Sequence, residues 1–260
     1  MRAIFRFIAA NNFLTILVAF ICFRFFSVFY NQTVDYFFCF GATFFCWLVY
    51  FIDKLKDTKA LSLNTVSRHT LSTNDKIIQY LLGSILAILC VVNFHAFSIK
   101  NYLIILFSIP LIFFYFLISK RYLKYIKEIF STSVIVLVVS IFPIITQLNL
   151  MQPILHLLFF LMVICNMFLL SISDFEIDKT NHFVSLSTSI GGRLLAIFFF
   201  IILAIILLLS MYIKVSFIAN WAIFYTVSSI LIWILSKKNG DKNLVHILAD
   251  SLFLFPIIFL

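Results

Sequence analysis

Long apolar segments dominate the sequence, and they restrict the chain to one class of fold. Continuous apolar runs of about 17–25 residues are typical of transmembrane helices. They do not alternate between apolar and polar positions, which argues against the strands of a membrane barrel. We therefore expect a single all-α integral membrane domain over residues 1–260, built as a bundle of nine helices. The predicted spans are 13–30, 34–52, 78–98, 102–119, 130–147, 153–172, 194–213, 215–235 and 244–260.

The composition agrees with this class. Hydrophobic residues make up 64% of the chain and charged residues only 11%, whereas a soluble domain carries about 25% charged residues. The cysteines lie inside apolar runs and none forms a C-x-x-C pair, so they are interpreted as small buried residues without a disulfide or metal framework. They are Cys22, Cys39, Cys46, Cys90 and Cys165.

The basic residues are distributed unequally between the two sides of the predicted bundle. Of the 19 Lys and Arg residues, all but Arg24, Lys100 and Lys214 fall on one side. The positive-inside rule makes that side cytoplasmic, with the N-terminus inside and the C-terminus outside. The net charge of +9 is then explained without nucleic acid. We expect a multi-pass protein of a bacterial cytoplasmic membrane.

Two pairs of aspartates share one spacing on this cytoplasmic side. Each pair follows a long apolar span, in the predicted loops 53–77 and 173–193. On a helix, residues four apart are separated by about one turn, a rise of ~6 Å, and point to the same face. Like charges at this spacing destabilise a helix, so a cation is expected to offset them. The pairs are Asp53 with Asp57, and Asp174 with Asp178.

A magnesium ion meets this requirement. Mg²⁺ binds in proteins through one or two carboxylates together with the phosphates of a substrate. Two facing carboxylate pairs would hold a diphosphate between them, and nearby basic side chains would contact its oxygens. The alternative interpretation is that the paired aspartates are only solvent-exposed charges of the loops. The basic candidates are Lys54, Lys56, Arg68, Lys120, Arg121 and Lys179.

At these residues the sequence resembles the UbiA family of membrane prenyltransferases. The first motif of that family, N-x-x-x-D-x-x-x-D, is matched by Asp53 and Asp57, with Val49 at the Asn position. The second, D-x-x-x-D, is matched by Asp174 and Asp178. The following stretch "FVSLSTSIGG" is similar to the Ser/Thr segment that ends near Gly in the family.

Two further segments resemble the family. "YFLISKRYLKYIKE" is similar to the segment after the fourth helix, through Tyr115, Lys120 and Arg121. "NTVSRHTLSTND" is similar to the loop between the second and third helices, through Arg68 and His69. The resemblance implies the nine-helix fold of the UbiA type, with both aspartate motifs on cytoplasmic loops.

The resemblance also implies an activity. The four aspartates would bind Mg²⁺ and transfer an isoprenyl group from its diphosphate to a lipophilic acceptor within the lipid membrane. Tyr50 and Tyr115 would face the allylic cation. An equally supported interpretation of Tyr50 is a tyrosine that lies at the membrane–water interface. The segment 58–75 would cover the headgroup. Two other functions remain as alternatives. One is an enzyme that cyclises the prenyl chain itself. The other is a non-catalytic carrier or assembly partner, which is favoured by Val49 at the Asn position of the first motif.

One acidic residue lies outside the motifs. Asp250 falls inside the last predicted span, and an intramembrane acid is a functional candidate by default. His246 precedes it by one helical turn. A structural pair between these two side chains is the competing interpretation.

Overall fold

The computed structural model describes residues 7–8, 11, 13–30, 36–60, 72–93, 127–141, 152–180, 185–238 and 241–259. All regular structure within these ranges is helical. The elements are α2 (Phe13–Phe29), α3 (Tyr36–Ala60), α4 (Thr73–Val92), α6 (Lys127–Val136) with the π-helical turn η2 (Leu137–Ile141), α7 (Gln152–Thr180), α8 (Leu186–Ile190), α9 (Gly192–Tyr212), α10 (Ser216–Lys237), and α11 (Lys242–Ser251) with the 3₁₀ segment η4 (Leu252–Phe259).

Four of these helices are long and apolar enough to cross a membrane: α4, α7, α9 and α10. The apolar segments Phe13–Phe29 and Tyr36–Ile52 are shorter. The prediction of an all-α protein of membrane type is therefore confirmed in its coarse form. The full set of nine spans stays a prediction, and the predicted span 102–119 lies outside the described residues.

Two helices continue beyond the predicted spans. Spans ending at residues 52 and 172 were expected, but α3 continues to Ala60 and α7 to Thr180. The added segments "DKLKDTKA" and "SDFEIDKT" contain no Gly or Pro, the two residues that disfavour a helix most. Polarity alone does not end a helix. Both aspartate pairs thus lie on helical backbone rather than in loops, so their four-residue spacing does correspond to one turn.

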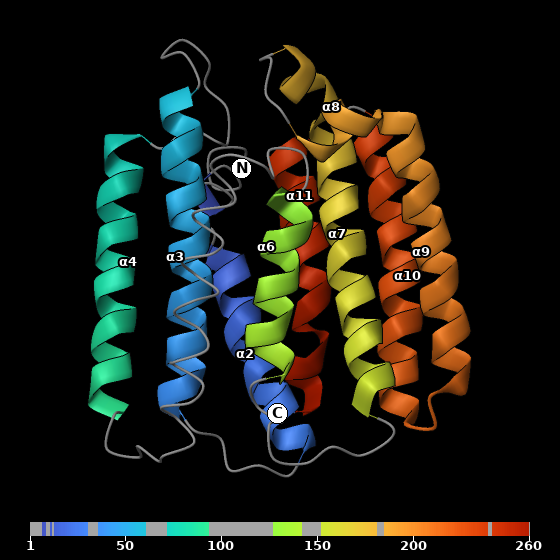
Figure 1. Ribbon diagram of the computed structural model, residues 1–260, viewed down its shortest axis with the longest axis horizontal. Coiled ribbons are helices and arrows are strands. Elements are labelled where there is room, and N and C mark those ends of the chain that lie inside the picture. Colours follow the sequence, from blue (N-terminus) through green and yellow to red (C-terminus); the bar gives the residue numbers. More distant parts are fainter. Residues whose placement is uncertain are drawn as a thin grey trace.

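The helices form a bundle in which both aspartate-bearing helices end on the same side. Figure 1 shows α3, α7 and α10 ending, and α4, α9 and α11 beginning, at the uppermost edge of the molecule. We call this edge the upper end. α3 packs against α2 and α4, whereas α7 packs against α6, α9, α10 and α11. The two aspartate motifs are therefore carried at one end of the bundle by two helices that share one apolar core.

Aromatic side chains fill the centre between α2, α7, α10 and η4. Trp221 and Tyr225 of α10 and Phe26 of α2 are fully buried. The Tyr225 hydroxyl donates a 2.7 Å hydrogen bond to the Met162 carbonyl, and Trp221 Nε1 donates one of 3.2 Å to the Leu252 carbonyl. Both bonds satisfy polar atoms that would otherwise be costly to bury.

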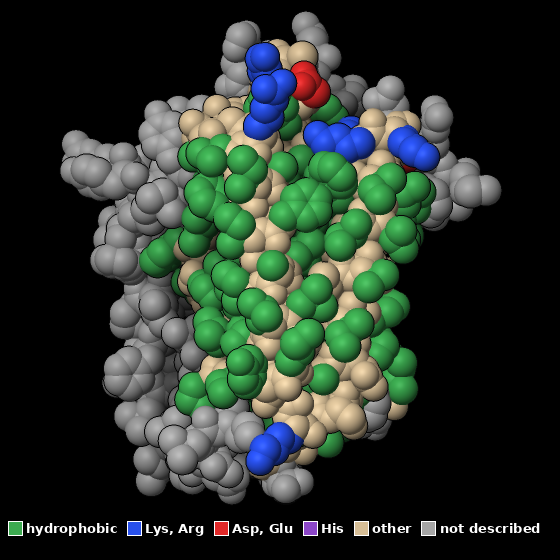
Figure 2. Space-filling model, turned by 90° about the vertical axis from the view of Figure 1, so that its right-hand side faces the viewer, with side chains coloured by type: hydrophobic (Ala, Val, Ile, Leu, Met, Phe, Trp, Pro, Cys, Tyr) green, Lys and Arg blue, Asp and Glu red, His purple; other side chains and the backbone are tan. Residues whose placement is uncertain are grey.

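The outer face of α9 and α10 is apolar over most of its height. Figure 2 shows hydrophobic side chains across this face and basic side chains only at its two ends. Exposed residues here include Ile197, Ile201 and Leu208 of α9 and Val227 and Leu231 of α10. An apolar band bounded by charge suits a surface that faces lipid.

A close contact joins α3 to α4. A Cβ atom at Gly83 would lie 2.2 Å from the Trp47 ring, so only glycine leaves room for that indole. Trp47 Nε1 donates a 2.8 Å hydrogen bond to Gln79 Oε1, and Gln79 Nε2 donates one of 2.7 Å to the Asn11 carbonyl. This contact fixes the pair of helices that frames the first aspartate motif.

Candidate functional site

The second aspartate motif turns towards the inside of the bundle. Asp174 and Asp178 are buried, with 4% and 3% of their surface exposed, whereas Glu176 between them is exposed. Burial of residues four apart and exposure of the one between them follow from the helical period. The prediction that the two aspartates share one face of a helix, and that Glu176 lies on another, is confirmed for this motif.

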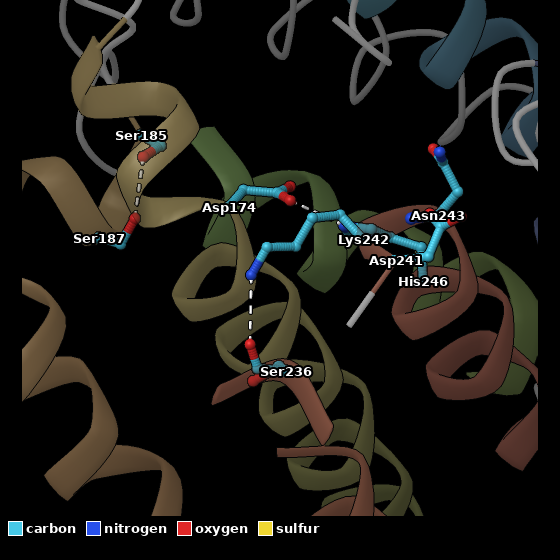
Figure 3. A network of polar contacts seen from close by, with 8 residues as sticks. All are labelled: Asp174, Ser185, Ser187, Ser236, Asp241, Lys242, Asn243 and His246. Carbon is cyan, nitrogen blue, oxygen red and sulfur yellow. Dashed lines mark hydrogen bonds and ion pairs between the residues drawn. The ribbon is translucent and has the colours of Figure 1, made fainter. Parts of the chain in front are cut away.

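Asp174 is bound by a histidine from another helix. His246 Nε2 of α11 lies 3.0 Å from Asp174 Oδ1 of α7, and both side chains are almost fully buried. Figure 3 shows the two side chains turned towards each other between the helices. A buried carboxylate is stable only when it is hydrogen-bonded or paired, so this contact helps to hold Asp174 in its inward position.

The start of α11 is fixed at the place where His246 can reach Asp174. Asp241 caps the helix by accepting a 3.0 Å hydrogen bond from the Asn243 N–H. Lys242 Nζ donates a 3.3 Å hydrogen bond to the Ser236 carbonyl at the end of α10 (Figure 3). His246 follows one turn later. The short connection between α10 and α11 thereby sets the height of the histidine along α7.

The Ser/Thr segment after the second motif folds back on α7. Ser185 and Thr188 form a reciprocal capping box at the start of α8. The N–H of Ser187 donates a 3.1 Å hydrogen bond to Ser171 Oγ of α7, and the Ser185 and Ser187 hydroxyls lie 3.1 Å apart (Figure 3). Gly191 then takes φ +88°, a conformation that favours glycine, and separates α8 from α9.

The first motif lies on the last two turns of α3. The backbone of Asp53 and Asp57 is helical, and Tyr50 and Lys54 are partly exposed on the same helix. The carboxylate positions of this pair lie outside the described residues, as do Tyr115, Arg68, Lys120 and Arg121. Lys179 of α7 is exposed, with its Nζ atom 6.0 Å from the centre of the Phe175 ring. Its predicted contact with phosphate stays a prediction.

The contact made by His246 was not predicted from the sequence. A local pair with Asp250, one turn away, was one of two interpretations, and the structure shows His246 in contact with Asp174. Asp250 accepts a 3.0 Å hydrogen bond from Thr15 Oγ1 and one of 3.1 Å from Asn166 Nδ2. Neither pairing has a signal in local spacing, because each joins helices far apart in the chain. Val49 of the first motif is buried in the apolar core.

The donor atoms at the upper end suit a hard divalent cation. Two buried carboxylates stand one turn apart on α7, and a second pair with the same spacing ends α3. Oxygen ligands of this kind are those that Mg²⁺ prefers. Among the side chains that the structure describes, His, Cys, Asp and Glu form no group of three. A metal would therefore be completed by the first motif or by substrate phosphates.

Comparisons with protein-family models, with curated proteins and with solved structures find no match to this chain. The resemblance of the aspartate motifs to UbiA prenyltransferases thus stays a prediction from the residues. Function is inferred here from the site, because a fold by itself does not determine an activity.

Proposed function

We propose that the protein is an intramembrane prenyltransferase that moves an isoprenyl group from its diphosphate to a lipophilic acceptor. One observation carries the proposal: Asp174 and Asp178 face inward at the end of the bundle where α3 brings Asp53 and Asp57. A diphosphate held at this end would leave its apolar chain among the apolar helices.

The four aspartates would hold Mg²⁺ together with the diphosphate. When bound, the metal supplies Lewis-acid stabilisation of the negative charge that develops on departing diphosphate. Asp174 and Asp178 fix one side of this arrangement from α7, and His246 keeps Asp174 oriented through its 3.0 Å contact. Outer contacts of this type tune how well a carboxylate binds a metal.

The basic side chains complete the proposed arrangement. Lys54 lies between the first-motif aspartates, and Arg68, Lys120, Arg121 and Lys179 are the further candidates for phosphate oxygens. Tyr50, one turn before Asp53, and Tyr115 would stabilise the allylic cation through their rings. Closure of the headgroup region against water would protect that cation from hydrolysis.

A second function is favoured by Val49. The position that carries Asn in the first motif of the resembled family is here an apolar side chain packed in the core. A carrier that binds a prenyl diphosphate without cleaving it, or an assembly partner, would not need that amide. Cyclisation of the prenyl chain would use the same ionisation as transfer and differs only in its product.

The experiment that separates these functions follows the fate of the prenyl group. The full chain in lipid nanodiscs is incubated with Mg²⁺, a radiolabelled prenyl diphosphate and a membrane lipid extract. Prenyl transfer predicts a labelled adduct of an extract component and free diphosphate. A labelled cyclic hydrocarbon would assign cyclisation, and tight binding of intact prenyl diphosphate would assign a carrier and overturn the proposal.

A further inference from the structure

Hydrogen bonds join the residue in front of α2 to the two helices that frame the first aspartate motif. Asn11, two residues before α2, is fully buried. Its carbonyl and Oδ1 atoms accept hydrogen bonds from Gln79 Nε2 of α4 at 2.7 and 3.2 Å, and its Nδ2 donates one of 3.3 Å to Asp75 Oδ1. Gln79 Oε1 in turn accepts the 2.8 Å bond from Trp47 Nε1 of α3. Asn11 is thereby tied to both α3 and α4.

The first turn of α2 makes a second set of contacts, towards the other motif. Thr15 Oγ1 donates a 3.0 Å hydrogen bond to Asp250 Oδ2 of α11, and Asn166 Nδ2 of α7 donates one of 3.1 Å to Asp250 Oδ1. α2 packs against both α3 and α11, and α11 packs against α7. The start of α2 is therefore linked to the helix of each motif. We call the linking side chains the polar bridge: Trp47, Gln79, Asn11, Thr15, Asp250 and Asn166.

The polar bridge reaches the two motif helices at similar depths below the upper end. Trp47 precedes Asp53 by six residues of α3, a rise of ~9 Å. Asn166 precedes Asp174 by eight residues of α7, a rise of ~12 Å. Both helices continue without a break from the bridge to the upper end (Figure 1). A shift of either helix at the bridge is therefore carried to its aspartates.

The bonds of the bridge are directional, whereas the packing around them is not. α3 and α7 contribute to one apolar core, and the burial of apolar surface has no preferred direction. A hydrogen bond weakens once its heavy atoms move beyond ~3.2 Å or its angle bends. Side chains of Thr, Asn and Gln join helices within membranes in this way. The bridge therefore fixes the register of α3 and α7 relative to α2 more narrowly than the apolar contacts do.

We propose that Asn11 and Thr15 are positioning residues, which set the separation of the two aspartate motifs through the polar bridge. Mg²⁺ requires nearly octahedral coordination with ligands at about 2.1 Å. Carboxylates from two helices therefore hold one unit of Mg²⁺ and diphosphate only within a narrow range of separations. Under the proposed function, on which this last step rests, the start of α2 tunes the affinity for Mg²⁺ and diphosphate from ~9–12 Å below the aspartates.

A distance measurement between the motif helices tests the positioning directly. Spin labels on unnatural amino acids at Thr58 of α3 and Glu176 of α7 avoid the five native cysteines. Double electron–electron resonance then gives the distribution of distances between the two labels in the full chain in nanodiscs, without any ligand. We expect one narrow distribution for the parent protein, because both helices are held by the bridge.

The variants break the bridge on either side of α2. Thr15→Val removes the hydroxyl at constant shape, and Gln79→Met removes the amide at similar length. Each should widen the distribution or shift its mean by about 1 Å or more, the displacement that breaks a hydrogen bond. Thr15→Ser keeps the hydroxyl and should restore the parent distribution. Because the two variants act on different sides, either one tests the proposal if the other does not fold.

Thr226→Val is the matched control for Thr15→Val. Thr226 of α10 is buried, and its hydroxyl donates a 2.8 Å hydrogen bond within its own helix, to the Ala222 carbonyl. This variant should leave the distance distribution unchanged. Parent-like distributions in both Thr15→Val and Gln79→Met, even with a lowered unfolding temperature, would reduce the bridge to a packing contact and overturn the proposal.

Binding of a prenyl thiolodiphosphate, whose carbon–sulfur bond resists cleavage, supplies the second measurement. The apparent affinity for Mg²⁺ in its presence should fall about threefold to thirtyfold in Thr15→Val and Gln79→Met, the usual size of a remote coupling effect. Thr15→Ser and Thr226→Val should bind as the parent protein does. Altered distances with parent-like Mg²⁺ affinity would contradict the tuning of this site.

The two measurements separate this inference from the proposed function. The distances are recorded without ligand, so they support the positioning role even if the protein never cleaves a prenyl diphosphate. Conversely, prenyl transfer by a parent protein whose motif distance does not respond to either variant would remove the inference and leave the proposed activity standing.

Discussion

His246 of α11 and Asp174 of α7 are joined by a 3.0 Å contact between Nε2 and Oδ1, although 72 residues separate them in the chain. The contact links the last helix of the bundle to the second aspartate motif. It is nearly inaccessible to solvent, so its loss affects both the stability of the helix packing and the orientation of a proposed metal ligand.

Replacing His246 by Ala should destabilise the protein by about 1–3 kcal/mol, because Asp174 loses a buried partner. Thermal unfolding in detergent measures the change. The Asp174→Asn variant and the double variant complete a double-mutant cycle, which cancels the effect of the cavity left by the imidazole. Additive effects of the two substitutions would show that the contact contributes no coupling.

Prenyl diphosphate and Mg²⁺ together should raise the unfolding temperature of the parent protein but not of Asp174→Asn or Asp178→Asn. Each substitution keeps the size of the side chain and removes one negative charge needed for Mg²⁺. We expect the apparent Mg²⁺ affinity to fall about tenfold or more, because a proposed carboxylate ligand loses its charge. Glu176→Gln is the control, since Glu176 is exposed on the same helix. An equal loss in that variant would indicate a non-specific charge effect.

Gly83→Ala should loosen the packing of α3 against α4. The added methyl group would lie 2.2 Å from the Trp47 ring, and overpacking of this kind costs about 1–3 kcal/mol. Gly41→Ala provides the matched control, because its nearest neighbour, Cys90 Sγ, is at an ordinary contact distance of 3.8 Å. Similar unfolding temperatures for the two variants would rule out the close indole contact.

Reporter fusions should place the two ends of α10 on opposite sides of the membrane. Lys214 precedes α10 at one end and Lys238 follows it at the other. The basic residues gathered at the upper end predict that a fusion after Lys238 is cytoplasmic and one after Lys214 is external. Reversed locations would invert the orientation, and a shared location would remove α10 as a span.

The helical architecture was predictable because an apolar run of membrane length has few other solutions. In hydrocarbon every backbone polar group must be satisfied within the segment, which favours helices. The ends of α3 and α7 were not predictable from hydropathy, because "DKLKDTKA" and "SDFEIDKT" are polar and yet form helix. Hydropathy locates the membrane boundary, whereas local propensity decides where the backbone stops being helical.

The candidate site was predictable only where one helix determines it. The inward face shared by Asp174 and Asp178 follows from the helical period. The partners of Asp174 and Asp250 depend on how α2, α7 and α11 pack, and this information is not present in any local window. The 3.0 Å contact of His246 with Asp174 was not predicted for that reason, because it depends on how α7 and α11 pack together.

Release of diphosphate from a prenyl diphosphate tests the central claim most directly. The parent protein in nanodiscs, supplied with a membrane lipid extract as the source of the prenyl acceptor, should release diphosphate only when Mg²⁺ is present. Asp53→Asn and Asp174→Asn should each lower that rate about a hundredfold or more, and the double variant should be little slower than either, because residues acting as one unit are not additive. Glu176→Gln should retain the parent rate. A parent protein that binds prenyl diphosphate with Mg²⁺ and never releases diphosphate would contradict the account.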